Sequence, residues 1–255
     1  MNRVAPLIYR EIKQMVNFKI FLLNTLLSPV VYLLFFAFGI ASNFGNINYK
    51  GVPINYVVFL LPGLIAIQSY NLYILSFASV STEKRPGVLK ILLISKVKLK
   101  HYIIAKISVG ALIVLIQALL LISTCLLITG FCISISSLQI ALLLTSLIMS
   151  SIAWCSLGIS LGSIITDDEL RNLINVIIGL PLMFSSSAFY NLERAPLWVK
   201  ILGMINPITY TSNTIRDSLL GLVDRLTLHS FIMLLLISIT LLVICINITK
   251  RVELL

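Results

Sequence analysis

The residues of this chain that could do chemistry are few, and none of them forms a catalytic motif. No G-x-x-x-x-G-K-[ST] segment occurs, so the chain lacks the P-loop with which many proteins bind and hydrolyse nucleotides. No HExxH segment or His/Cys cluster occurs either, and His101 and His229 stand far apart near the ends of apolar runs. The sequence alone supports no Ser-His-Asp arrangement. We therefore expect no catalytic residue, no metal site and no enzyme activity in this chain.

Polar side chains also gather in the stretch NPITYTSNTIRDSLLG, residues 206–221, which stands between two hydrophobic segments. Asn206 can cap a helix, Pro207 suits the first helical position, and Gly221 can end the helix. Apolar residues recur within it at helical spacing, so one side of this helix can face lipid. The whole block 191–228 is too polar to span a membrane and too apolar for a free loop. It predicts two short helices that enter one leaflet and return.

The composition indicates that lipid surrounds much of the chain. Of its 255 residues, 59% are hydrophobic and 11% are charged, whereas soluble domains average about 25% charged residues. The net charge of +10 could suggest nucleic acid, but the charges cluster between apolar runs, as charges that set membrane topology do. We therefore expect no nucleic-acid partner. The four cysteines lie in or beside apolar runs and are interpreted as small buried hydrophobic residues.

The spacing of the charges predicts an all-α polytopic membrane protein that forms a single domain over residues 1–255. One run, residues 107–166, contains 60 residues without Asp, Glu, Lys, Arg or His. As one helix it would be about 90 Å long, roughly three hydrocarbon thicknesses, so it must fold back near residues 129–137. Six transmembrane helices are expected, at 20–41, 56–80, 103–129, 138–165, 172–190 and 230–249. Five spans, with segment 172–192 re-entrant, is the alternative.

The distribution of Lys and Arg predicts the orientation. With six spans, 14 of these residues fall on the side of the two termini and five on the other side. The positive-inside rule then places both termini in the cytoplasm and block 191–228 outside.

Two segments on the cytoplasmic side have more than one interpretation. Residues 4–19 place Ile8, Ile12 and Met15 on one face, which predicts an amphipathic interfacial helix. This helix is either a general membrane anchor or a contact for a partner. Residues 83–106 carry seven Lys/Arg and one acid, Glu83, around a short apolar helix near Leu89. This loop, placed at 83–101, is either a basic loop held by anionic lipid or a docking helix for a cytoplasmic protein.

The predicted spans contain almost no charge but several neutral polar side chains. All nine acids fall in loops or at span ends, whereas ion-driven transporters and channels often carry charged residues inside their spans. The neutral polar residues favour an amphipathic cargo, although such residues also bond helices to one another. Candidates for the substrate path are Asn24, Gln68, Asn71, Asn175 and Phe189.

Three segments together resemble a known family. FLLPGLIAIQSY (59–70) is similar to its span-two start, EKRPGVLKILLISKVKLKHYIIAK (83–106) resembles its basic loop, and FYNLERAPLWVKILGMINPITYTSNTIRDSLLG (189–221) is similar to its external end. The chain resembles, over nearly its whole length, the permeases of type-2 ABC transporters. The likeness is greatest to the bacterial branch that exports daunorubicin and nodulation factors. Lys90 and Lys96 depart from the pattern, where an acid and a proline are usual, and SSSAFY (185–190) replaces a more glycine-rich stretch.

The resemblance implies a permease of an exporter in the bacterial cell membrane. Its substrate would be an amphipathic compound such as a drug or antibiotic, a lipid or a lipid-linked sugar. Two permease chains, identical or homologous, would join two cytoplasmic ATPase subunits, and ATP and Mg²⁺ would bind only to those subunits. An ion-coupled transporter or channel is the alternative function.

The resemblance also implies roles for two sets of residues. A coupling helix in the basic loop would sit on the ATPase, with coupling residues Glu83, Arg85, Gly87, Leu89, Leu92 and Leu93. The external helices would form a re-entrant gate at the exit, with Asn206, Pro207, Tyr210 and Arg216.

The apolar face of the basic loop yields a first prediction. Leu89→Asp or Leu92→Asp should leave membrane insertion intact but uncouple ATP hydrolysis from transport, because a carboxylate cannot pack in an apolar contact. Hydrolysis and transport are measured on the same reconstituted complex. Unchanged transport would mean that the loop serves topology alone.

Overall fold

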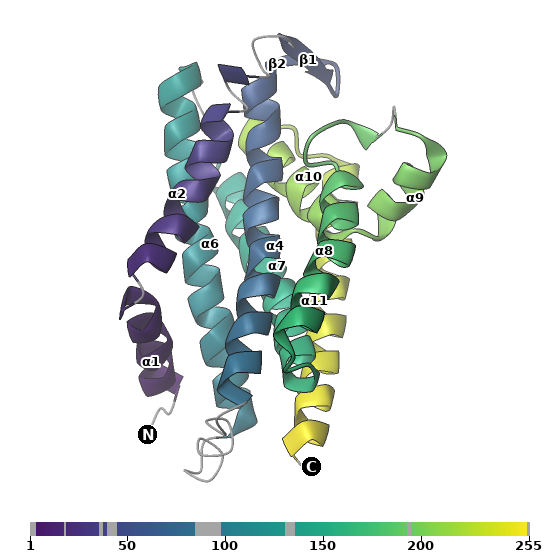
Figure 1. Ribbon diagram of the computed structural model, residues 1–255. Helices are drawn as coiled ribbons and strands as arrows, with labels where there is room; N and C mark the ends of the chain where they lie inside the picture. Colours follow the sequence, from purple (N-terminus) through teal and green to yellow (C-terminus); the bar gives the residue numbers. More distant parts are fainter. Residues whose placement is uncertain are drawn as a thin grey trace.

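The computed structural model describes residues 4–17, 19–35, 38–39, 45–84, 98–130, 136–192 and 195–253, which form an almost entirely helical bundle (Figure 1). Both ends of the chain lie at one end of this bundle, which we call the termini end (Figure 1). The opposite end carries a small β-hairpin and is called the hairpin end. The nearly all-helical architecture of a polytopic membrane protein is therefore confirmed.

Four of the described helices are long and apolar enough to cross a membrane. They are α4 (Tyr56–Lys84), α6 (Leu99–Thr129), α7 (Ser137–Ile164) and α11 (Arg225–Glu253). The charge-free run does fold back, since α6 ends at Gly130, which has a left-handed φ of 63°, and a capping box of Ser136 and Gln139 starts α7. Helix α4 is the most enclosed of the four.

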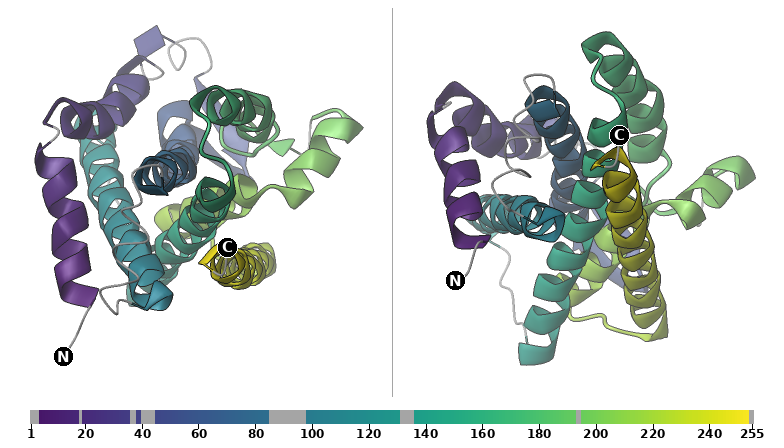
Figure 2. Two further views of the ribbon diagram at one scale, coloured as in Figure 1. Left: turned by 60° about the horizontal axis from the view of Figure 1, so that its bottom comes forward. Right: turned by 90° about the horizontal axis from the view of Figure 1, so that it is seen from below.

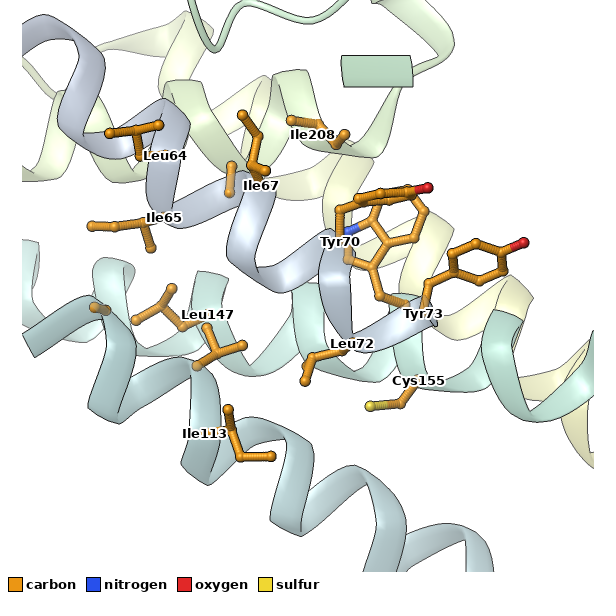
Figure 3. Packing of buried hydrophobic residues seen from close by; sticks show 14 of the residues in the cluster. Leu64, Ile65, Ile67, Tyr70, Leu72, Tyr73, Ile113, Leu147, Cys155 and Ile208 are labelled. Carbon is orange, nitrogen blue, oxygen red and sulfur yellow. The ribbon is translucent and has the colours of Figure 1, made fainter. Parts of the chain in front are cut away.

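The core lies where α4 packs against α6 and α7, and it includes Leu72, Ile113 and Cys155 (Figure 3). Two glycines of α7 allow a close approach to α4. A Cβ atom on Gly158 would lie 2.4 Å from the carbonyl oxygen of Tyr73, and one on Gly162 would lie 2.8 Å from that of Phe77. Gly158 and Gly162 form a GxxxG pair, which commonly brings membrane helices into backbone contact.

Shorter helices flank this centre on opposite sides. Helices α1 (Val4–Asn17) and α2 (Lys19–Phe35) lie on one side, and α8 (Asp168–Phe184) and α9 (Leu197–Ile205) on the other (Figure 2). Helices α2 and α8 have 17 residues each, so each is about 25 Å long, against about 30 Å of hydrocarbon. The count of six spans therefore stays a prediction that rests on these two helices.

The expected block between the last two spans contains α9 and α10 (Pro207–Leu220). Helix α9 projects from the bundle and exposes an apolar face that includes Leu197 and Trp198 (Figure 1). Helix α10 packs instead against α4, α7 and α11, and ten of its 14 residues are buried. Of these two helices, only α9 therefore has the apolar surface expected of a helix in contact with lipid.

The expectation of an all-helical chain missed a hairpin made of β1 (Asn46–Tyr49) and β2 (Val52–Asn55). The strands pair antiparallel, with Tyr49 opposite Val52. The two turn residues, Lys50 and Gly51, have φ values of 49° and 83°. Positive φ at both central residues is typical of the tightest hairpin turns, and Gly51 was the local signal for one.

Candidate functional site

A buried ion cluster at the termini end joins α1, α4 and α6. It consists of Arg10, Glu11, Glu83, Tyr102 and Lys106. The Lys106 ammonium donates to Glu11 Oε2 at 3.0 Å, to Glu83 Oε1 at 3.3 Å and to the hydroxyl of Ser79 at 2.7 Å. The Lys106 side chain is only 4% exposed, so these three oxygens replace its water shell.

The same cluster fixes the end of α4. Glu83 accepts hydrogen bonds from Arg10 at 2.9 Å and from the Tyr102 hydroxyl at 2.6 Å, and Arg10 also donates to Glu11. Two cations therefore face two carboxylates, and the cluster is neutral. A buried charge network is tolerated when every member is paired in this way, and removal of one member leaves another uncompensated.

The cluster sets the ionisation of the α1 residues. Burial opposes the charged form of Glu11, but the Lys106 charge and hydrogen bonds from Arg10 and Lys106 outweigh it and hold the pKa of this carboxyl below 4.5. Burial also opposes the charge of Arg10, yet its contacts with Glu11 and Glu83 raise the Arg10 pKa. Both side chains are therefore ionised at neutral pH.

Glu11 and Lys106 were missed as site residues in the sequence. Lys106 was counted only among the charges that set topology. Glu11 gave a usable signal, because it stands on the apolar stripe of residues 4–19, three residues after Ile8 and four before Met15. When the apolar face of a helix packs against the protein, a carboxylate on that face needs a buried cation as its partner.

Two neighbouring cavities run along α4. The first, of about 380 Å³, lies between α1, α4 and α6 and has Glu11, Glu83 and Lys106 in its wall. The second, of about 280 Å³, lies between α2, α4 and α6, and it shares three apolar wall residues with the first: Leu72, Leu75 and Ile113. Ligand pockets typically start at about 300 Å³, so the first cavity has the size of a site for a small ligand and the second falls just below that size.

The second cavity brings together three of the five predicted path residues. Asn24 of α2 and Gln68 and Asn71 of α4 all line it. Asn175 lies on α8, where its Oδ1 atom is buried and has no hydrogen-bond partner within the described residues. Phe189 stacks on Phe184 in the segment that follows α8. The last two residues belong to neither cavity.

At the hairpin end, the predicted gate residues form the start and the anchor of α10. Asn206 caps the helix by accepting from the backbone N–H of Ile208 at 3.0 Å, and Pro207 is the first helical residue. The Asn206 amide also donates to the carbonyl of Leu182. Tyr210 is half-buried and donates to the carbonyl of Met204.

Arg216 is fully buried and is held mainly by neutral oxygens. Its guanidinium donates to the carbonyls of Phe59 at 3.1 Å and Ser187 at 2.8 Å, and to side-chain oxygens of Ser212 and Asn213. The guanidinium carbon also lies 4.1 Å from the centre of the Phe59 ring, a cation–π contact. Arg216 thus ties α10 to α4 and to the segment after α8.

The neighbouring Asp217 ties α10 to the hairpin, a contact that the sequence did not reveal. It accepts from Tyr49 at 2.9 Å, from Lys50 at 2.8 Å and from Thr227 at 2.6 Å. Lys50 also pairs with Asp224 at 3.0 Å. Burial opposes ionisation of Asp224, but hydrogen bonds from Thr227 and Lys50 lower its pKa to about 2.

Of the six predicted coupling residues, only Glu83 lies within the described residues. Glu83 belongs to the buried ion cluster, but Arg85, Gly87, Leu89, Leu92 and Leu93 lie outside the described residues. The ends that flank this segment are described: α4 ends at Lys84 and α6 begins at Leu99.

Comparison with known proteins now identifies the class. Residues 4–220 match the family model of the ABC-2 type transporter, and the chain belongs to this family of membrane transport subunits. The expected relationship to type-2 ABC permeases is therefore confirmed. Such permeases normally work with an ATP-binding subunit and are not themselves catalytic.

A particular relative agrees with this class. The chain is 25% identical over 211 residues to a protein of Cyanophora paradoxa named "Putative transport permease ycf38". The match covers 82% of this chain and 71% of that protein.

The ionisation of Glu11 predicts an acid-dependent release of α1. Because the folded-state pKa of Glu11 is lowered, its pairing stabilises the docked helix above about pH 4.5 and is lost as the pH falls through the folded value. A spin label at Tyr9→Cys should become more mobile as the pH falls through the lowered pKa of Glu11. The label is placed in a Cys132→Ser background, because Cys125, Cys155 and Cys245 are buried. Glu11→Gln should remove this transition, whereas Glu169→Gln on the exposed start of α8 should keep it. The same transition in Glu11→Gln would contradict this assignment.

The buried guanidinium predicts that Arg216→Met destabilises the hairpin end. The change removes the Arg216 donor from the carbonyls of Phe59 and Ser187. The Phe59 carbonyl keeps its helical N–H partner, whereas a buried carbonyl left unsatisfied at Ser187 costs about 1–3 kcal/mol. The melting temperature of the chain in lipid nanodiscs should fall. Arg225→Met removes an exposed cation at the same end and should have little effect. Equal losses in the two variants would show that Arg216 is not an anchor.

Proposed function

We propose that this chain is the membrane subunit of an ABC exporter that moves an amphipathic compound out of the cytoplasm. A drug or antibiotic, a lipid and a lipid-linked sugar are the substrate classes that fit. Two permease chains, identical or homologous, assemble with two ATP-binding subunits, which carry the ATP and Mg²⁺. Both termini face the cytoplasm of a bacterial cell, and residues 1–255 act as one permease domain.

The buried ion cluster is the observation that carries this proposal. Glu83 stands two residues before segment 85–97, and Tyr102 and Lys106 stand in the first turns of the helix that follows it. The two ends of the segment are therefore bonded to each other. Arg10 and Glu11 add α1 to the same unit. A push on this segment by an ATPase would then reach α1, α4 and α6 together.

The path residues support an amphipathic cargo. The two cavities follow α4 from the ion cluster toward the middle of the bundle, and apolar side chains form their shared wall. At the other end, α10 and its anchor Arg216 act as the outer gate. In this account Asn206, Pro207 and Tyr210 set the position of the helix.

An ion-coupled transporter is the second candidate, and one observation favours it. Lys106, Glu11 and Glu83 line a cavity, and buried ionisable residues in membrane proteins often mark ion paths. Each of these charges is already paired, however, so none is left to bind a transported ion. The structural role of the cluster is the stronger interpretation.

The proposal is tested by isolating the chain from native membranes and by reconstituting it. The tagged chain should recover an ATP-binding protein and should lack ATPase activity alone. Proteoliposomes that contain both proteins should accumulate a fluorescent amphiphile when ATP is outside, and a proton or sodium gradient should not replace ATP. Flux driven by such a gradient through the chain alone, with no ATPase recovered, would establish the second candidate instead.

A further inference from the structure

The cavity between α2, α4 and α6 has neutral polar side chains but no charge in a mainly apolar wall. Five apolar residues of α4 and α6 line it, together with neutral hydrogen-bonding side chains from all three helices. The polar members are Asn24, Thr25, Ser28, Gln68, Asn71 and Gln117. The residues of α4 and α6 stand near the middle of their helices, far from the charged ends.

Gln117, one of the residues that line this cavity, keeps an unpaired buried acceptor. Its Nε2 atom donates to the backbone carbonyl of Thr25 at 2.7 Å. Because a carbonyl oxygen can only accept, this bond fixes the orientation of the amide, and Oε1 is the atom left over. Gln117 is only 2% exposed, and Oε1 has no hydrogen-bond partner in the described part of the chain. An unsatisfied buried acceptor costs about 1–3 kcal/mol, so a native structure that keeps one calls for a donor from elsewhere.

Gln68 of α4, which also lines the cavity, can supply a donor. Asn71 donates from Nδ2 to Gln68 Oε1 at 3.0 Å, which leaves Gln68 Nε2 without a partner among the described residues. Helix α4 thus carries an N–H group in the wall of the cavity and α6 an amide oxygen. A hydroxyl or amide group of a ligand can satisfy both, because it donates and accepts at once.

We propose that this cavity binds the uncharged, hydroxyl- or amide-bearing head of an amphipathic molecule. Gln117 accepts a hydrogen bond from the head, Gln68 donates one to it, and the apolar part lies against Leu72, Leu75 and Ile113. A charged head is rejected because no residue of the wall could neutralise it, and a buried unpaired charge is far more costly than a buried hydroxyl. The assignment deepens the proposed exporter function and rests on it.

The test uses photolabelling of the full chain in lipid nanodiscs. The probe is decyl glucoside with a diazirine in its alkyl chain, and the competitors are decyl glucoside, decyl sulfate and decyltrimethylammonium. Labelled peptides should come from α2, α4 and α6, and only the uncharged competitor should suppress the label. Equal suppression by all three heads, or labelling confined to other helices, would overturn the proposal.

Two variants separate recognition from structural support. Gln117→Leu should weaken competition by decyl glucoside about tenfold, the effect of losing one hydrogen bond of about 1.4 kcal/mol. Because this variant also loses the bond to Thr25, Asn71→Asp provides the sharper result. Asn71 is exposed at the rim, and a carboxylate there should make decyltrimethylammonium the strongest competitor. A purely structural role for these amides predicts no change in the order of competitors.

The control is Thr124→Val on the same helix as Gln117. Among the described residues, the Thr124 hydroxyl bonds only the Leu120 carbonyl of its own helix, and Thr124 does not line the cavity. This variant should label like the wild type. A tenfold loss in Thr124→Val as well would mean that the effect of Gln117→Leu is not local, and the assignment of Gln117 would fall.

Two further arms identify the source of the head group and separate this inference from the exporter proposal. Monoglucosyl diacylglycerol in the nanodisc bilayer suppresses the label if the head belongs to a bilayer lipid, and it leaves the label unchanged if the head belongs to a smaller mobile cargo. The labelling needs no ATPase. If no ATP-binding protein is recovered with the chain, the exporter proposal fails while selective labelling by uncharged heads still stands.

Discussion

The contacts of one buried ammonium group, that of Lys106, hold the termini end of this protein together. Carboxylates from α1 and α4 and a hydroxyl from α4 surround it, and Arg10 and Tyr102 complete the shell of Glu83. Without this shell the lysine would be too costly to bury, and α1 would have only its apolar stripe to hold it. The paired charges fix a helix that could otherwise lie anywhere on the membrane surface.

The arrangement of charged side chains differs between the two ends of the molecule and the cavity between them. The termini end uses paired ions, which are directional and sensitive to acid. The hairpin end uses Arg216, bonded mainly to neutral oxygens, and Asp217, paired with Lys50. The cavity between α2, α4 and α6 has neither cation nor anion in its wall. Charge thus fixes the positions of helices at the two ends, and the cavity between them, where we propose that an uncharged head group binds, has only neutral groups in its wall.

The sequence predicted those features that depend on neighbouring residues. The fold-back of run 107–166 follows from length, and Asn206, Pro207 and Gly221 bound α10 because capping is a local interaction. The most distant partners of Lys106 and Asp217 could not be predicted, since Glu11 and Tyr49 lie 95 and 168 residues away from them. Three path residues share a cavity, but sequence alone could not place Asn175 and Phe189 outside it. The hairpin was missed because its strands have only four residues each and are partly polar, so this stretch was interpreted as a polar loop after the first span.

The central claim is that the buried ion cluster makes α1, the end of α4 and the start of α6 move as one body when the ATPases act. Distances between pairs of spin labels test it directly in the complete transporter, free of nucleotide and trapped with ADP and vanadate. Labels at Tyr9→Cys and Lys100→Cys, in the Cys132→Ser background, should keep one distance in both states. Labels at Tyr9→Cys and Lys250→Cys should change their distance. A change between Tyr9 and Lys100 as large as that between Tyr9 and Lys250 would contradict the account.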